Sequence, residues 1–336
     1  QAPAVAEAVK MMEEYLIGKD PRRIEHHWQA LYRGGFYRGG PILTSALSGI
    51  EQAMWDLLGK SLETPVYQLL GGAVRERVKV YAHVGGDTTE ELCTRSKALA
   101  TQGFSVLKTS FAPPVAYLEN QAFVESCTER FATLRNVVGP EVDLAIDFHG
   151  RFSPAMSKRM IRALEPYYPF FIEEPCLPGN TDALVELRNS TTVPLATGER
   201  LFTKWGFRDL IQRQAVAILQ PDLCHAGGIG EVKKIAAMAE ACDLAVAPHN
   251  PLGPISLAAC LQLDACTHNA FLQEQVTLGE GYLKEPFIME EGYIKVPQKP
   301  GLGIELDVAR IKELEYDGRW QTPRVFDDKD SSVAEW

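Results

Sequence analysis

Three acidic residues stand at equal intervals in the middle of the chain. Asp147, Glu173 and Glu199 each end a mostly apolar run, and 26 residues separate each from the next. That interval accommodates about one strand, one helix and two short loops. Carboxylates gathered from neighbouring strand ends repel one another unless a cation lies among them, and oxygen ligands suit a hard divalent ion such as Mg²⁺. The spacing predicts a metal site, against the alternative of three unrelated surface acids.

Glu173 and Glu174 are alternative candidates for the second of these acidic positions. Side chains alternate along a strand, so only one of Glu173 and Glu174 can face inward. Glu173 keeps the interval of 26 residues and is the predicted ligand.

A further acid and two histidines stand at comparable positions. Asp222 and His249 each end an apolar run, so neighbouring strands would bring them within hydrogen-bonding distance. An aspartate orients an imidazole and raises its basicity, which makes His249 a candidate general base. His149 lies two residues beyond Asp147, on the same side of an extended chain, and is a candidate for donating a proton. A structural histidine is the alternative in both cases.

Two other polar residues each allow two interpretations from their positions. Glu274 ends the last apolar run and could bind a substrate oxygen or be an ordinary surface acid. Arg38 lies in the glycine-rich loop 33–41, which could fold over a site and present cations to an anion, or could be a connector. The run 226–230 lacks the pattern of a phosphate-binding loop and predicts a β/α turn, without a nucleotide. His83 is placed outside the strand ends.

Strands and helices alternate along most of the chain, which predicts an α/β protein of the (β/α)8 (TIM-type) barrel class. The expected strands are 78–84, 105–111, 142–148, 169–174, 194–199, 217–222, 244–249 and 270–275, and the expected helices between them are 88–102, 117–138, 153–166, 180–190, 205–214, 229–241 and 254–265. Helices are also expected at 3–18, 21–32 and 44–60, with Asp20 capping the second of these and Pro21 beginning it.

The expected domain organisation has three parts. Residues 1–77 form a partial, α-rich N-terminal capping region, 78–280 form the barrel with the metal site, and 281–336 close the barrel and return to the cap.

Composition narrows the classes of partner. The chain has 336 residues and a net charge of −10, which argues against nucleic acid and anionic membrane surfaces. No apolar run approaches the ~18 residues of a membrane span, and the first residues lack the pattern of a signal peptide. Seven cysteines without a CxxC motif are typical of reduced thiols. We therefore expect a cytoplasmic enzyme with a small-molecule substrate.

Motifs along nearly the whole chain, over about 5–307, resemble the mandelate racemase branch of the enolase superfamily, and within it the dehydratases of sugar acids such as galactonate. They are 36–41, 147–151, 171–175, 198–200, 219–222, 225–229, 247–254 and 272–275. The resemblance implies Mg²⁺ on the three evenly spaced acids, the Asp222–His249 pair as the base and His149 as the general acid. It also places Glu274 near the substrate carboxylate.

The expected activity is Mg²⁺-dependent dehydration of an aldonate to a 2-keto-3-deoxy acid through an ene-diolate intermediate. Lys108, at the end of the second strand, and Arg38 are expected to bind the substrate, and the enzyme is expected to be a homo-oligomer. Two alternatives stay open: a cycloisomerase or epimerase acting on a related acid or lactone, and a catalytically silent homologue that binds metal and an anion.

Two departures from the family pattern bear on this expectation. Ser110 stands where racemases present a second basic lysine, so racemisation by two bases is disfavoured. The chain also starts at a helix, whereas family members begin with a small sheet whose loop covers the barrel mouth. A weakly sealed site is therefore expected, unless residues 33–41 or another subunit close it.

Overall fold

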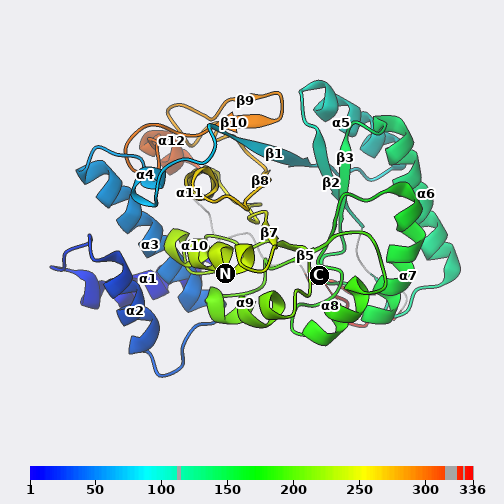
Figure 1. Ribbon diagram of the computed structural model, residues 1–336, viewed down its shortest axis with the longest axis horizontal. Coiled ribbons are helices and arrows are strands. Elements are labelled where there is room, and N and C mark those ends of the chain that lie inside the picture. The colour runs from blue at the N-terminus through cyan, green and yellow to red at the C-terminus, as the bar shows by residue number, and fades with distance from the viewer. Residues whose placement is uncertain (112–114, 315–323, 328–329, 336) are drawn as a thin grey trace.

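The protein consists of a layer of N-terminal helices beside a barrel of parallel strands surrounded by helices (Figure 1). The computed structural model describes residues 1–111, 115–314, 324–327 and 330–335. The α/β barrel class predicted from the alternation of strands and helices is confirmed.

Within the described residues, eight parallel strands form the barrel: β1 (Arg77–His83), β2 (Val106–Ser110), β3 (Asp143–Asp147), β4 (Ile172–Glu173), β5 (Leu195–Thr197), β6 (Ile218–Leu219), β7 (Ala245–Val246) and β8 (Gln273–Gln275). Each of β1 to β6 pairs with the next strand in sequence, and β8 pairs with β1. A parallel bridge between Val246 and Ala270 joins β7 to the start of the β8 segment and closes the ring. All eight expected strands are present, and most are shorter than expected because their ends turn into loops.

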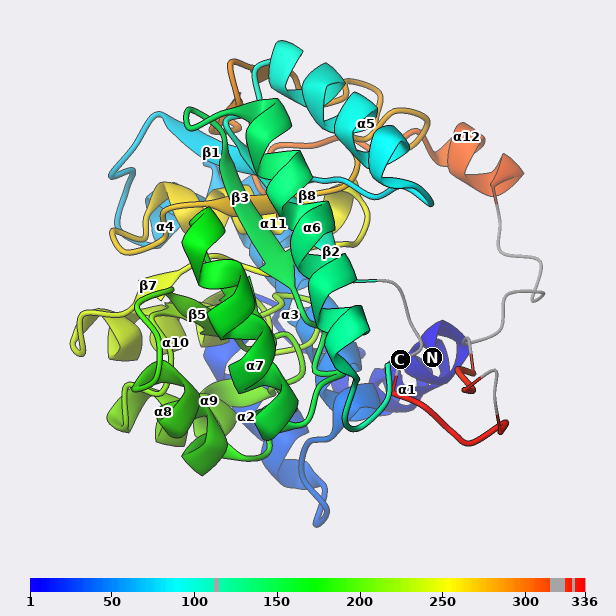
Figure 2. The same ribbon diagram turned by 90° about the vertical axis from the view of Figure 1, so that its right-hand side faces the viewer.

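Seven helices follow the strands in the described part of the barrel: α5 (Thr89–Thr101), α6 (Gln121–Val138), α7 (Pro154–Leu164), α8 (Thr181–Arg188), α9 (Thr203–Gln212), α10 (Ile229–Glu240) and α11 (Pro254–Ala265), with a short 3-10 helix (Glu165–Tyr167) after α7. Figure 2 shows α5, α6 and α7 along the outer face of β2 and β3. Side chains of Thr88, Asn120, Ser153 and Asn180 accept a backbone N–H in the first turn of α5 to α8. Such caps satisfy amides that a helix start leaves without partners.

The centre of the barrel is filled by one apolar side chain from each strand or strand end. These side chains are Tyr81, Val106, Ala145, Phe171, Ala196, Ile218, Ala247 and Leu272, and they form a cluster separate from the larger core outside the strands. Because side chains two apart on a strand share a face, the residues that follow this layer by two also point toward the barrel axis. The next layer therefore lies at the carboxyl ends of the strands, where barrel enzymes place their active sites.

The N-terminal layer contains α1 (Ala2–Leu16), α2 (Ile24–Gly34), α3 (Pro41–Ser61) and α4 (Val66–Leu69). The predicted start of the second helix at Pro21 is wrong, because α2 begins at Ile24. Asp20 does not cap it; its carboxylate instead accepts hydrogen bonds from the backbone and guanidinium of Arg22.

Side chains of α3 hold the segment that follows β6. Glu51 accepts hydrogen bonds from the amides of Ile229 and Gly230 at 2.8 and 2.7 Å, and Ser48 accepts one from Gly227 at 2.9 Å. Gly228 has φ +93°, and a Cβ there would collide with the Glu51 carboxylate. The turn predicted at 226–230 is confirmed. The carboxylate of Glu51 binds the amides at the start of α10, a position where helices favour a negative charge.

The residues after the barrel extend the sheet and contact the helical layer. Strands β9 (Met289–Glu290) and β10 (Tyr293–Lys295) pair antiparallel, and β10 pairs with β1. Gly301 exchanges backbone hydrogen bonds with Thr64 and Val66, and α12 (Val308–Glu313) follows. The boundaries at 77/78 and 280/281 stay predictions. Of the predicted segment 281–336, residues 315–323, 328–329 and 336 lie outside the described residues.

Within the described part of the chain, no helix combines the length and the apolar character that crossing a membrane requires.

Asp264, on α11, is a buried acid without a counter-charge at hydrogen-bonding distance. It is 1% exposed, and neither carboxylate oxygen has a hydrogen-bond partner among the described residues. Burial raises its pKa from 3.8 to about 8. The folded state therefore binds a proton that the unfolded chain has released above pH 3.8, and stability contributed by this site falls as pH rises toward 8.

We predict that Asp264→Asn, which cannot ionise, flattens the pH dependence of stability. Between the two pKa values, one such group contributes about 1.4 kcal/mol per pH unit to the slope. Denaturant unfolding from about pH 5 to pH 8 measures the slope for each variant. Asp182→Asn, whose acid is 88% exposed, is the control and should keep the wild-type slope. An unchanged slope in Asp264→Asn would contradict the prediction.

Candidate active site

A ring of polar side chains lies above the apolar layer of the barrel. Counting two residues beyond each member of that layer gives His83, Lys108, Asp147, Glu173, Gly198, Gln220, His249 and Glu274. Seven of these eight are polar, and the exception is a glycine that is followed directly by Glu199. Alternation along the strands therefore brings the predicted acids and His249 to one end of the barrel.

Asp147 and Glu173 stand side by side, because they are partners in the register of β3 and β4. Lys108 donates to both oxygens of Glu173 at 2.6 and 2.7 Å, and Gln220 donates to one of them at 2.7 Å. Burial and the neighbouring carboxylates of Glu173 and Glu199 raise the pKa of Asp147. The ammonium of Lys108 therefore balances only part of the negative charge gathered here.

Gly198 lets the chain turn so that Glu199, and not its neighbour, reaches the ring. Its φ is +145°, and a Cβ would lie 2.8 Å from Phe207 and 2.9 Å from the amide of Gln220. Glu174 accepts hydrogen bonds from the Thr197 hydroxyl and, at 3.0 Å, from the Gly198 amide. Glu173 therefore joins the ring, while Glu174 braces the turn, with burial raising its pKa to about 7.

Glu199 lies between the two predicted acid–base histidines. One carboxylate oxygen is 3.1 Å from Nε2 of His249, and the other is 3.8 Å from Nε2 of His149. Burial opposes ionisation of Glu199, but the hydrogen bond and positive charge of His249 outweigh it and lower the pKa to about 2. Nε2 of each imidazole thus faces the space that the acids surround.

The predicted pair of Asp222 and His249 forms. Nδ1 of His249 lies 2.9 Å from a carboxylate oxygen of Asp222, and the two residues form a bridge that extends the pairing of β6 and β7. The other oxygen of Asp222 accepts the Cys224 amide at 2.7 Å. Burial alone would lower the pKa of His249, but the carboxylates of Glu274, Asp222 and Glu199 raise it well above 6.5.

His149 occupies a tight turn after β3. Its φ is +59°, its amide donates to Asp147 at 2.6 Å, and Arg200 donates to its carbonyl at 2.9 Å. The guanidinium of Arg151 lies 2.9 Å from Nδ1. Burial, together with the positive charges of both arginines, lowers the pKa of His149 to about 4. The imidazole is therefore neutral at neutral pH in this arrangement.

Glu274 is a buried member of the ring and not a surface acid. Its side chain is fully buried, Lys108 lies 2.8 Å from Oε1, and the amide of Asn250 donates to Oε2 at 2.6 Å. Burial disfavours the charged carboxylate, but the positive charges of Lys108 and His249 outweigh it and lower its pKa. Lys108, itself 1% exposed, thus bridges Glu173 and Glu274.

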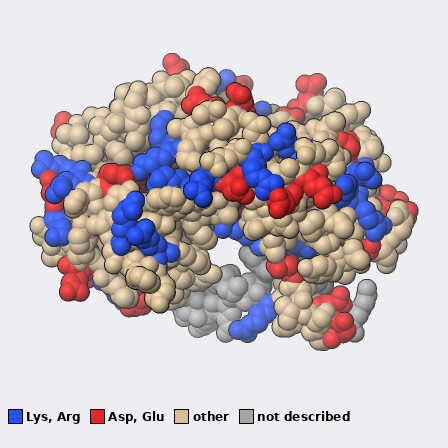
Figure 3. All heavy atoms as spheres, turned by 60° about the horizontal axis from the view of Figure 1, so that its bottom comes forward, with Lys and Arg blue, Asp and Glu red and all other residues tan. Residues whose placement is uncertain are grey.

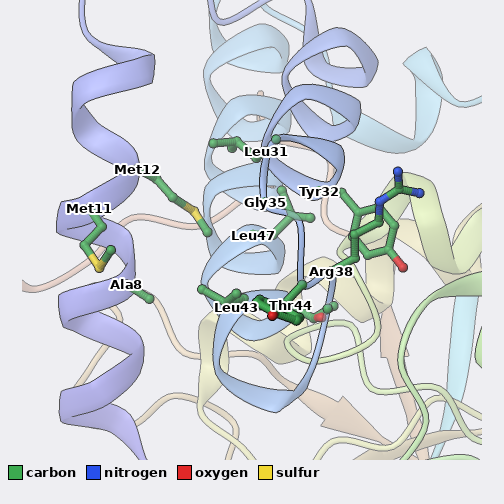
Figure 4. A pocket seen from close by; sticks show the side chains of 13 residues that line it. Ala8, Met11, Met12, Leu31, Tyr32, Gly35, Arg38, Leu43, Thr44 and Leu47 are labelled. Carbon is green, nitrogen blue, oxygen red and sulfur yellow. The ribbon is translucent and has the colours of Figure 1, made fainter.

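Arg38 is not brought together with the other predicted site residues. It is exposed, and it forms no hydrogen bond or ion pair with any described residue. It borders an apolar cavity of about 420 Å³ between α1 and the start of α3, near Tyr32 and Met12 (Figure 4). Its predicted contact with the substrate stays a prediction.

Two members of the ring were missed by the reasoning from sequence. The placement of His83 outside the strand ends is wrong, because it is the last residue of β1 and contacts Glu274. Its position two residues after the aromatic Tyr81 in a strand was the available signal. Gln220 was not among the predicted site residues; it follows Ile218 of the apolar layer by two residues and donates to Glu173.

The three carboxylates fit a divalent cation in their chemistry. All offer oxygen ligands, their side chains are almost fully buried, and burial together with the charges of Glu173 and Glu199 raises the pKa of Asp147. No group of three His, Cys, Asp or Glu side chains in the described ranges is arranged to hold a metal ion without rearrangement. Here Glu173 is bound by Lys108 and Gln220, and Glu199 by His249.

One face of the molecule is hollowed near its centre (Figure 3). Basic and acidic side chains are interspersed on the described part of this face, and neither sign gathers into a broad patch. The surface there has mixed charge, in contrast to the acidic cluster inside the barrel mouth.

A barrel with acids and histidines at the carboxyl ends of its strands is a class of enzyme fold, and two known family models match this chain. Residues 91–310 match the model "Enolase C-terminal domain-like", and residues 2–71 match the model of the mandelate racemase / muconate lactonizing enzyme N-terminal domain. The chain therefore belongs to the mandelate racemase branch of the enolase superfamily, as its motifs indicated.

Individual relatives agree with this assignment. A D-galactonate dehydratase from Ralstonia nicotianae is 47% identical over 347 aligned positions, which cover 100% of this chain and 91% of the relative. Among solved structures, a mandelate racemase/muconate lactonizing enzyme-like protein from Rubrobacter xylanophilus has a TM-score of 0.90 at 35% identity, covering 95% of this chain and 89% of the other. A mandelate racemase/muconate lactonizing enzyme from Jannaschia sp. CCS1 has a TM-score of 0.90 at 31% identity, covering 95% and 87%.

Proposed function

We propose that this enzyme dehydrates an aldonate, such as galactonate, to a 2-keto-3-deoxy acid with the help of Mg²⁺. The chain is a dehydratase, and so a lyase, since it is 47% identical over its whole length to a D-galactonate dehydratase. The aldonate, the metal and the role of each residue are our proposal. Asp147, Glu173 and Glu199 are the proposed metal ligands, because they stand at or just beyond the carboxyl ends of three neighbouring strands, β3, β4 and β5.

The observation that supports this chemistry most directly is the position of Glu199. One carboxylate separates the Nε2 atoms of two imidazoles, at 3.1 and 3.8 Å. A reaction that removes a proton from one carbon and a hydroxyl from the next uses a base for the proton and an acid for the hydroxyl, and the two imidazoles can take these roles. Bound Mg²⁺ would supply Lewis-acid stabilisation of the negative charge that develops on the substrate carboxylate.

His249 is the proposed base. Asp222 accepts the hydrogen on Nδ1, so Nε2 is the atom that takes the C2 proton. A base must enter the step without that proton, so the raised pKa of His249 does not support this role, which rests on the geometry of the pair with Asp222. The electron pair of the broken C–H bond moves into the carboxylate and gives the ene-diolate. The return of these electrons expels the C3 hydroxyl, and the resulting enol becomes the 2-keto acid.

His149 is the proposed acid, which gives the departing hydroxyl its proton so that water leaves. Its position opposite His249 supports this role. Its lowered pKa of about 4 does not, because a general acid must enter the step protonated. The assignment therefore rests on geometry, and an exchange experiment described in the Discussion tests it.

A panel of sugar acids, assayed for 2-keto-3-deoxy product, tests the function. We expect dehydration of at least one aldonate in the presence of Mg²⁺. Isomerised or epimerised product without loss of water would favour a cycloisomerase or epimerase, and binding without turnover would favour a silent homologue. Ser110, in place of a basic residue on β2, disfavours epimerisation by two bases. A homo-oligomeric state and a cytoplasmic location stay predictions.

A further inference from the structure

His83 follows the apolar layer of the barrel by two residues in β1, as Lys108 does in β2 and Glu274 does in β8. The pairing of β1 with both neighbours sets Tyr81 opposite Glu274 and His83 opposite Lys108. His83 also follows Tyr81, its strand's member of the apolar layer, by two residues. It therefore belongs to the same ring as the residues to which the dehydration mechanism assigns roles, although that mechanism gives it none.

The contact of His83 with Glu274 is direct. Nε2 of His83 bonds to Oε1 of Glu274, which Lys108 also contacts at 2.8 Å. Oε2 accepts the Asn250 amide and lies 3.9 Å from Nε2 of His249, which is beyond hydrogen-bonding distance. The remaining accepting capacity of Glu274 is thus on Oε2, toward the proposed base.

The other ring nitrogen of His83 has a different environment. A carboxylate only accepts, so Nε2 carries the shared hydrogen, and Nδ1 of the neutral imidazole is an acceptor. No described residue donates to Nδ1, and the side chain is 41% exposed, compared with 1% for Lys108 and 0% for Glu274. His83 is therefore more open to an entering solute than its neighbours in the ring.

We propose that His83 contacts the substrate and helps to determine which aldonate the enzyme accepts. Its Nδ1 accepts a hydrogen bond from one substrate hydroxyl, while its Nε2 holds Glu274 with Oε2 directed toward the reaction. A polyhydroxylated acid is the chemical class that offers such a donor beside a carboxylate. The inference rests on the proposed function and deepens it.

The test combines changes in the enzyme with changes in the substrate. His83→Phe keeps a planar ring without either nitrogen, and His83→Asn keeps a polar group that can donate and accept. His268→Phe is the matched control, because His268 is exposed and precedes β8 at the opposite end of the barrel. Each variant is assayed with the preferred aldonate and with analogues that each lack one hydroxyl beyond C3, and circular dichroism with thermal unfolding checks the fold.

For the wild type, one deoxy analogue should have kcat/KM about tenfold below the parent, the effect of one lost hydrogen bond. His83→Phe should lose about tenfold on the parent, mainly through KM, and should no longer distinguish that analogue from the parent. His83→Asn should recover part of the loss, and His268→Phe should match the wild type.

Two results would overturn the inference while leaving the function intact: His83→Phe discriminating as the wild type does, or losing activity equally on all substrates with an altered fold. If the wild type dehydrates no aldonate at all, the proposed function itself fails, and the role of His83 fails with it.

Discussion

Replacing His249 with asparagine is expected to lower the dehydration rate by roughly 10²–10⁴-fold, the usual effect of losing an acid–base group. The reason is that Nε2 of His249 is the proposed acceptor of the C2 proton and is held in place through Nδ1 by Asp222. The same variant should not exchange the C2 proton with solvent. Incubation of the substrate in D₂O, followed by NMR or mass spectrometry, measures exchange and dehydration together.

His149→Asn is the matched variant on the other side of the site. It should lose dehydration to a similar extent, but C2 exchange should continue because the base is intact. Exchange that persists in His249→Asn and vanishes in His149→Asn would reverse the two roles. This comparison is informative because the lowered pKa of His149 argues against a proton donor, while its position opposite His249 argues for one.

Changing Glu199 to glutamine is expected to weaken Mg²⁺ binding by at least about tenfold and to remove activity, while the barrel stays folded. Glutamine preserves the size of the side chain, but it lacks the charge that balances the cation. Titration calorimetry with Mg²⁺ measures the affinity, and thermal unfolding checks the fold. Glu186→Gln, at a position 73% exposed on α8, is the control and should bind Mg²⁺ as the wild type does.

Glu199 also contacts His249, so loss of activity alone would not identify a metal ligand. Asp147→Asn separates the two effects, because the Asp147 side chain bonds to the His149 amide and contacts neither imidazole in the hydrogen bonds described. Both variants should bind Mg²⁺ more weakly. Unchanged Mg²⁺ affinity in either one would show that the proposed ligand set is wrong.

Most of the ring was predictable because strand alternation is a local property. Asp147, Glu173, Asp222 and His249 end apolar runs at intervals that the β/α repeat explains, and the choice of Glu173 over Glu174 follows from one interval of 26 residues. The position of His83 was contained in the same periodicity. It was missed because its chemistry became visible only when β1 was placed beside Glu274 of β8.

The sequence does not show directly that the first and last strands of the barrel become neighbours when it closes. β1 and β8 are neighbours in space although about the whole barrel sequence separates them. That pairing sets His83 and Lys108 on Glu274. The packing of the helical layer on the barrel, in turn, places Glu51 of α3 against the segment after β6. Arg38, by contrast, was assigned to the site from its loop composition, and the packing of α1 to α3 leaves it exposed at an apolar cavity.

The sequence by itself determined the barrel and, from the period of two, Asp147, Glu173 and His249 at the strand ends, and its motifs determined the family. The tertiary structure decided the pKa values and the ion-pair partners of these side chains. The low pKa of His149, the high pKa of Asp264 and the position of Lys108 between two carboxylates arise from burial and from charges that distant segments contribute. Electrostatic energies depend on distances and solvent exposure, which residue spacing does not specify.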